Sequence, residues 1–308
     1  AQEYFPQGEP DRELSRQELS QLTESLRTND AFWELCAAHS RKTYPEAETY
    51  LVQEGLLDSV PYALVDSGWI GSMQKTLGQL LKQVCVTQAQ GNQHNGLTGY
   101  YWGLYDLPER TNTNDYRAYY FTPSAGESEK CAFNNNLFEV LFSAPHGMTV
   151  GYQDGKPVFG KTQEEQVSLI KKIEPELMAY VKAVSSIHES ANRESYRTVI
   201  KELFSCLMCQ PTKMEARAFG QIPFSDDIFA EVGRRIAEPE SEDALNSSHP
   251  MQKVLRVSAL KKEKEIVLPW YEGSAVLSTG NTDKHLRAYQ KYKKLLTLKQ
   301  ERNWRNKT

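Results

Sequence analysis

The stretch 62–77 carries the side chains best suited to chemistry, because an acid is followed at once by glycines and a hydroxyl group. Asp66 comes directly after a short apolar run, and Gly68, Gly71 and Ser72 follow it. An acid at the end of a strand can hold sugar hydroxyls or a metal. Glycines permit tight or positive-φ backbone, so free N–H groups and a helix dipole can point at one phosphate. The pattern predicts a site for a phosphorylated sugar or nucleotide.

The same stretch also predicts the elements that would position this site. We expect a strand over 63–65 and a helix over 73–81, with Ser72 as the helix cap. The β-prone run 97–105 is then the next strand, at the spacing of a βαβ unit. Residues 106–130 are polar and predict a loop. The alternative interpretation is an ordinary capped turn between a strand and a helix, with no ligand.

Helices are expected over 15–27, 31–41, 45–52, 163–190 and 193–209. A capping box of Ser15 and Glu18 opens the first of them. We expect Asp30 to cap the second, Pro45 to begin the third and Pro175 to interrupt the fourth. Residues 137–143 suit either a helix or a strand.

A turn signal also stands between two apolar runs further along the chain. Asp154 and Gly155 separate 146–152 from 156–159, which predicts a β-hairpin. Short strands are expected near 251–268.

Composition narrows the class of protein. The 308 residues suggest one large domain or two modest ones, and 39% apolar content is enough for a core. A mean hydropathy of −0.60 and the lack of a long apolar run predict no transmembrane helix, and the polar start predicts no signal peptide. Five scattered cysteines fit a reducing cytoplasm. Cys206 and Cys209 are expected to be buried helix residues rather than a zinc pair.

Charge is concentrated at the C-terminal end of the chain. Residues 281–308 hold nine lysines or arginines against two acids, so this tail has a net charge of +7. The whole chain has a net charge of −4, which leaves about −11 for the rest. Apolar side chains are interleaved with the cations, as in a basic amphipathic helix that contacts an anionic membrane face. The alternative is a solvated last helix. The acidic remainder of the chain argues against nucleic acid. We expect a helical segment 1–58, an α/β catalytic core 59–270 and a basic helix 271–308.

Four pieces of the sequence resemble one family. The motif Asp-x-Gly-Trp-x-Gly-Ser-x-Gln of residues 66–74, followed by 99–104, is similar to a domain of bacterial capsule and O-antigen gene clusters. The runs 138–152 and 211–216 are also similar to that family, and the resemblance covers roughly 14–270. Such domains often follow, or are paired with, a phosphatase of the haloacid-dehalogenase type. Ser67 stands where the family would have an aliphatic residue.

The resemblance implies a fold and an activity. It implies a parallel-sheet, phosphoribosyltransferase-like (Rossmann-like) α/β core with added N- and C-terminal helices. The implied activity is a glycosyltransferase reaction in which ribofuranose 5-phosphate passes from phosphoribosyl pyrophosphate to a glycan acceptor, which we expect to be lipid-linked. A partner or fused phosphatase then removes the phosphate. We expect the chain to work in the cytoplasm, with peripheral contact at the inner face of the membrane.

The resemblance also implies roles for named residues. Asp66 would hold the ribose hydroxyls, although the adjacent pair of acids usual in such sites is reduced here to this one acid. The phosphate would be bound by the loop of Gly68, Trp69, Ile70, Gly71 and Ser72. Mg²⁺ carried by the donor would neutralise the leaving pyrophosphate, and we expect no metal bound by the protein itself.

Three further side chains have expected roles, each with a structural alternative. Arg41 and Lys42 would help to neutralise the pyrophosphate, or they are cations at a helix end. Glu139 lies in an apolar run, where a carboxylate is costly unless it is used or paired, and it would act as base toward the acceptor hydroxyl.

Two other functions are compatible with the pattern. In a nucleotide-sugar glycosyltransferase, the same loop would hold a diphosphate. In a non-catalytic scaffold, the chain would dock a phosphatase. A phosphatase activity of this chain itself is disfavoured, because Ser67 and Gly68 follow Asp66 where the Asp-x-Asp of such enzymes would stand.

Overall fold

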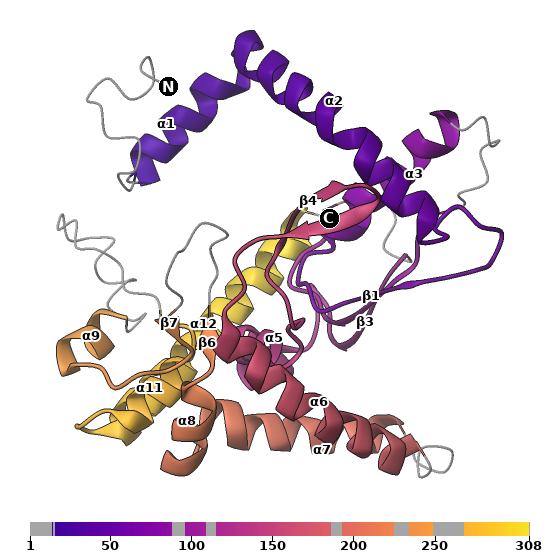
Figure 1. Cartoon of the computed structure of the whole chain (residues 1–308). Coiled ribbons are helices and arrows are strands. Elements are labelled where there is room, and N and C mark those ends of the chain that lie inside the picture. Colours follow the sequence, from indigo (N-terminus) through magenta and orange to yellow (C-terminus); the bar gives the residue numbers. More distant parts are fainter. Residues whose placement is uncertain are drawn as a thin grey trace. The chain divides into compact units, whose positions relative to one another are not determined.

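The computed structural model describes residues 14, 16–87, 96–108, 115–185, 193–224, 234–248 and 268–307. The chain forms two compact units (Figure 1). The first is Ala1–Leu57 with Val150–Val158, and the second is Asp58–Thr149 with Phe159–Thr308. The architecture is mixed α/β and mostly helical, with a small three-stranded parallel sheet in the second unit. Within the described ranges, no helix is both long and apolar enough to cross a membrane.

The helices of the first unit are α1 (Arg16–Arg27) and α2 (Asp30–Gln53). The helix expected up to Arg27 is confirmed, while Ser15 lies outside the described residues. Asp30 was the wrong cap, because the side chain of Asn29 accepts the hydrogen bond from the Phe32 N–H at 2.8 Å. The prediction that a separate helix begins at Pro45 was also wrong. Proline removes one backbone donor, yet α2 runs through Pro45 from Asp30 to Gln53.

A β-hairpin completes the first unit, formed by β4 (Thr149–Gln153) and β5 (Lys156–Phe159). Asp154 and Gly155 have φ of 52° and 67°, the left-handed pair that a two-residue hairpin turn requires, so the predicted hairpin is confirmed. The ring of Tyr152 stacks on Tyr50 of α2 with centroids 4.8 Å apart. This contact packs the hairpin on the helix.

The second unit contains the sheet, with strand order β1 (Leu64–Asp66), β2 (Gly99–Gly103) and β3 (Tyr116–Phe121), all parallel. Helix α3 (Ser72–Thr87) connects β1 to β2, which confirms the predicted βαβ unit. The helix begins at Ser72 itself and extends beyond the expected end. The loop predicted over 106–130 was wrong, because this stretch contains β3 and the short helix α4 (Glu127–Cys131).

Gln74, the last residue of the motif, has a structural role in this unit. Its side chain is buried, and its amide donates to the carbonyls of Leu97, at 2.5 Å, and Asp115, at 3.0 Å. Its oxygen accepts from the Tyr101 hydroxyl at 2.8 Å. One side chain therefore fixes α3 against β2 and against the segments that lead into β2 and β3.

A glycine in β2 makes this arrangement sensitive to substitution. A Cβ at Gly99 would lie 1.9 Å from Oε1 of Gln74, so Gly99→Ala must displace an amide held by three hydrogen bonds. We expect Gly99→Ala to lower the free energy of unfolding by about 1–3 kcal/mol, measured by urea denaturation.

The matched control is Gly78→Ala, in the middle of α3. Nothing lies within 4 Å of a Cβ at Gly78, so this change should stabilise the chain by about 0.5–1 kcal/mol through helix propensity. Equal stability of the two variants would contradict the assigned role of Gln74.

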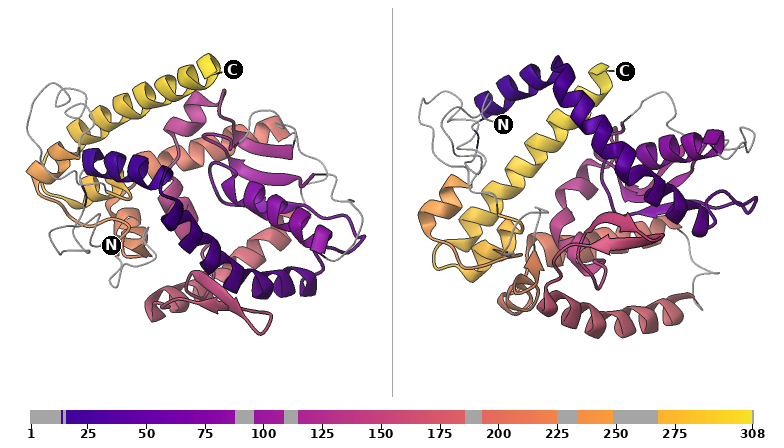
Figure 2. Two further views of the ribbon diagram at one scale, coloured as in Figure 1. Left: turned by 90° about the horizontal axis from the view of Figure 1, so that it is seen from above. Right: turned by 45° about the horizontal axis from the view of Figure 1, so that its top comes forward.

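The remaining elements complete the second unit (Figure 2). They are α5 (Asn135–Leu141), α6 (Glu164–Ser185), α7 (Arg193–Phe204), a π-helical turn (Ser205–Cys209), α8 (Lys213–Gly220), β6 (Pro223–Phe224), β7 (Arg234–Arg235), α9 (Glu242–Ser247), α11 (Tyr271–Leu277) and α12 (Thr282–Lys307). The helix expected over 193–209 is confirmed as α7 and its π turn. The interruption expected at Pro175 was wrong, because α6 runs through it. The strands expected near 251–268 lie almost wholly outside the described residues.

An aromatic core holds these helices to the sheet. Its fully buried members include Tyr120 of β3, Leu137 of α5, Met208 of the π turn and Trp270, the residue before α11. The indole N–H of Trp270 donates to the carbonyl of Met208 at 2.8 Å. The five cysteines are free thiols. Cys209 is buried, but Cys206 is exposed, so the expectation that both are buried was wrong for Cys206.

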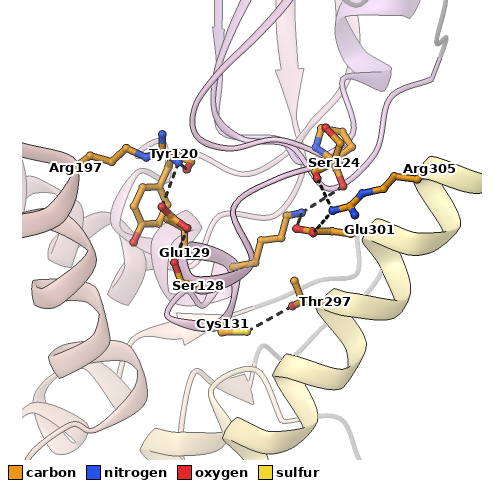
Figure 3. A network of polar contacts seen from close by, with 11 residues as sticks. Tyr120, Ser124, Ser128, Glu129, Cys131, Arg197, Thr297, Glu301 and Arg305 are labelled. Carbon is orange, nitrogen blue, oxygen red and sulfur yellow. Dashed lines mark hydrogen bonds and ion pairs between the residues drawn. The ribbon is translucent and has the colours of Figure 1, made fainter. Parts of the chain in front are cut away.

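Buried ion pairs fasten the last helix to the core. Lys130 of α4 pairs with Glu301 of α12 at 2.8 Å, and both side chains are almost fully buried. Arg305 contacts the other oxygen of Glu301 at 3.2 Å (Figure 3). On the far side of α4, Glu129 pairs with Arg197 of α7 at 3.2 Å. The short helix α4 therefore links α7 and α12.

Candidate active site

Asp66 lies at the carboxyl end of β1, opposite Tyr101 of β2. Its Oδ1 accepts a hydrogen bond from the Gly68 N–H at 2.8 Å, which closes a tight turn directly after the strand. A Cβ at Gly68 would lie 2.9 Å from the other carboxylate oxygen, so any larger residue there would displace the Asp66 carboxylate from this position. The loop thus orients the acid, as expected, but the Gly68 N–H that was expected to bind phosphate is already used by Asp66.

The rest of the loop leads into the N-terminus of α3. Gly71 has φ +66°, and a Cβ there would lie 2.5 Å from the Tyr116 ring. The Trp69 carbonyl accepts from the Tyr105 N–H at 2.8 Å, which ties the loop to the segment after β2. Among the described residues, no hydrogen bond engages the backbone N–H groups of Trp69, Ile70 and Gly71. With the first backbone N–H groups of α3 and the exposed Ser72, they can serve as donors for an anion, whereas the N–H of Lys75 already donates to the Gly71 carbonyl at 3.2 Å.

The Trp69 side chain joins this loop to helix α5. Its ring packs in the aromatic core, edge-on to Phe133 and Phe138 with centroids 5.3 and 5.9 Å apart. Its indole N–H donates to Oε1 of Glu139. The ring is therefore part of the core, and the polar edge holds a carboxylate in place.

Helix α5 brings Glu139 to this position. The Asn134 side chain caps the helix by accepting from the Leu137 N–H at 2.8 Å, and α5 then buries Leu137, Phe138 and Val140. The segment that suited either a helix or a strand is therefore a helix. Glu139 lies half-buried between these buried residues.

The charge of Asp66 acts on the Glu139 carboxyl, which is held by the indole three residues after Asp66. Burial raises the pKa of the Glu139 carboxyl above its ordinary value, and the negative charge of Asp66 raises it further. The hydrogen bond from Trp69 acts in the opposite direction, but the net shift is upward. A carboxylate with a raised pKa is a better base than an exposed one. Through Trp69, the structure thus links Glu139 to the loop that follows Asp66, two features that the sequence indicated separately.

Tyr101 is a neighbour of this site that the sequence reasoning missed. Burial raises the pKa of its hydroxyl, and Asp66 and Tyr116 raise it further, so the group is neutral near pH 7. The Tyr101 hydroxyl donates a hydrogen bond to Gln74, so its ring is held in place beside Asp66. The alternation along β2 was the available signal, since Gly99 and Tyr101 both face Gln74 of α3.

Two hollows in the second unit lie elsewhere. One, of about 170 Å³, is lined by Lys75 and Lys82 of α3 and by Gly96 and Asp115, at the amino ends of the strands. The other, of about 690 Å³, lies along α12. Neither contains Asp66 or Glu139 in its lining.

Arg41 and Lys42 are exposed on α2 of the first unit. Their assignment as pyrophosphate ligands stays a prediction. In the described part of the chain, no group of three or more His, Cys, Asp or Glu side chains could hold a metal ion.

Comparison with known proteins adds no assignment. No protein-family model matches the chain, and a search of curated proteins finds no significant match.

Proposed function

We propose that this chain transfers ribofuranose 5-phosphate from phosphoribosyl pyrophosphate to a hydroxyl group of a glycan acceptor, within a phosphoribosyltransferase-like core. The observation that carries this proposal is that one loop, which ends in a helix N-terminus, orients Asp66 through the Gly68 N–H and holds Glu139 through the Trp69 indole, so that the charge of Asp66 acts on Glu139. The sequence resemblance supplies the donor. A partner phosphatase would then remove the 5-phosphate from the product.

Each group has a defined part in the reaction. Asp66 holds the ribose hydroxyls, and the free N–H groups from Trp69 to the first turn of α3 bind the 5-phosphate. The acceptor oxygen bonds to C1 of the ribose, and pyrophosphate leaves with the electron pair of the broken bond. Glu139 takes the proton of the acceptor hydroxyl. Mg²⁺ would arrive with the donor and would neutralise the leaving pyrophosphate.

Calorimetric titration of the full chain with phosphoribosyl pyrophosphate and Mg²⁺ tests the donor site. The informative variant is Asp66→Asn, because an amide oxygen can still accept from the Gly68 N–H while the charge that binds sugar hydroxyls is lost. Hydrogen bonds to charged groups contribute about 1.5–3 kcal/mol, so we expect donor affinity to fall roughly 10- to 150-fold. Asp58→Asn, at an exposed position before β1, is the matched control.

The outcomes separate the competing functions. Binding of the ribosyl donor that is lost in Asp66→Asn and kept in Asp58→Asn supports the proposal. Binding of a nucleotide sugar instead would identify a nucleotide-sugar glycosyltransferase. Failure of every donor to bind would favour a scaffold for a phosphatase.

A further inference from the structure

Helix α12 has one face fixed to the second unit. His285, Thr297 and Glu301 are buried on that face, and Lys293 reaches the fully buried Glu272 at 3.0 Å. One lysine of the basic tail, Lys293, therefore belongs to the buried face. The side chains on the opposite face are exposed and can be reached by a partner.

That opposite face carries what we call the outer stripe. It consists of exposed residues spaced three or four apart, Lys284, Arg287, Lys291, Leu295, Leu298 and Arg302. This spacing places them on one side of the helix over a length of about 27 Å. Leu295 is 53% exposed and Leu298 is 43% exposed. Two large apolar side chains in water, with cations on both sides of them, need an explanation.

The cations of the outer stripe are available for a partner. Among the described residues, none of the four forms an ion pair, and the stripe contains no acid. Arg287 and Lys291 also line the hollow of about 690 Å³ beside α12, together with Gln210 and Pro211. The lining also contains Asp283, so the two cations outnumber the acids, and a lipid head group has the size to enter this groove.

We infer that the outer stripe docks the chain on an anionic lipid bilayer. Leu295 and Leu298 enter the boundary between head groups and acyl chains, while the cations contact lipid phosphates. The body of the chain carries about −11, so an anionic surface repels it and α12 becomes the contacting face. Nucleic acid fits less well, since leucines rather than aromatic rings stand between the cations. This inference does not depend on the identity of the donor.

Co-sedimentation of the full chain with lipid vesicles tests the inference. Vesicles of phosphatidylcholine with phosphatidylglycerol should bind the chain, and vesicles of phosphatidylcholine alone should not. Each basic residue near such a surface is worth about a fivefold change in binding. We therefore expect the variant with glutamine at all four stripe cations to bind on the order of several hundredfold more weakly.

Two further variants sharpen the test. The charge-matched control carries glutamine at four exposed lysines of α6 and α8 (Lys171, Lys172, Lys182 and Lys213), and it should bind anionic vesicles nearly as well as the parent. Leu295→Ser combined with Leu298→Ser should weaken binding about tenfold or more while the dependence on salt remains. Circular dichroism confirms that each variant is folded.

Several results would overturn the inference. Equal loss in the α6 and α8 control would show a general charge effect rather than a docking face. Equal binding to neutral vesicles would show that anionic lipid is not required. Full binding by the serine variant would show that the two leucines are not part of the contact. Tighter binding to an RNA duplex than to vesicles, lost with the same four cations, would assign the stripe to nucleic acid.

Discussion

The Glu139→Gln variant is expected to lose about 10²- to 10⁴-fold in the rate of ribosyl transfer and to remain folded. If Glu139 takes the proton of the acceptor hydroxyl, an amide in its place has no basic oxygen to receive it. The amide keeps the shape of the side chain, and its oxygen can still accept the hydrogen bond from Trp69. The measurement is pyrophosphate release in the presence of acceptor. Donor affinity should stay unchanged.

The same residue should set the acidic limb of the pH profile. Burial raises the pKa of Glu139 above that of an exposed glutamate, and Asp66 adds to this. The base must be ionised to work, so activity should fall as pH drops through this raised pKa, at a higher pH than for an exposed carboxylate. The Asp66→Asn variant should move that limb to lower pH, because one of the two causes is removed. A limb that does not move would contradict the coupling of the two acids.

The free energy of unfolding should change with pH in the opposite direction to the activity. Because the folded-state pKa of Glu139 lies above the unfolded value, its contribution to stability is full below the unfolded pKa and is lost as pH rises through the folded-state pKa. Glu139→Gln should therefore be at least as stable as the parent at pH 7. Glu240→Gln is the matched control, since burial and then Glu238 raise the pKa of Glu240, a residue outside the site. A loss of rate in both variants would remove Glu139 from its proposed role.

Local sequence rules were sufficient where the structure is decided locally. The Asp154–Gly155 turn follows from its two residues, because both must adopt positive φ. The βαβ unit follows from an apolar strand, a glycine loop and a helix in order. The missed strand β3 had a local signal as well, since Tyr116–Phe121 is rich in β-prone aromatics. The polar residues on either side of this segment led to the prediction of a loop.

The candidate site depended on contacts that sequence rules do not reach. Asp66 could be placed at the end of its strand, but the position of Glu139 beside it depends on how α5 packs through Trp69. The charge pattern of the tail gave a basic helix, but it did not show that Lys293 faces inward. That orientation is set by Glu272, a buried acid within α11.

Lys293→Met is expected to be among the most destabilising single changes in α12, at about 3–5 kcal/mol. The lysine lies 3.0 Å from Oε1 of Glu272, whose side chain is fully buried, and 3.6 Å from the Cys209 thiol. Burial alone would lower the pKa of Lys293, but the Glu272 carboxylate outweighs it and the net pKa is raised. Removing the lysine leaves a buried negative charge without a cation. Urea denaturation of the variant and the parent measures the loss.

Two comparisons make this expectation specific to the buried pair. The next lysine of the helix, Lys294, pairs with Glu127 at 3.8 Å in solvent, so Lys294→Met should cost less than about 1 kcal/mol. Glu272→Leu added to Lys293→Met should recover most of the lost stability, because it removes the unpaired charge. Among the described residues, Oε2 of Glu272 has no hydrogen-bond partner, so the native pair is itself incompletely satisfied. Equal costs at Lys293 and Lys294 would show that the pair does not fix α12, since a buried charge left alone must cost far more than one in water.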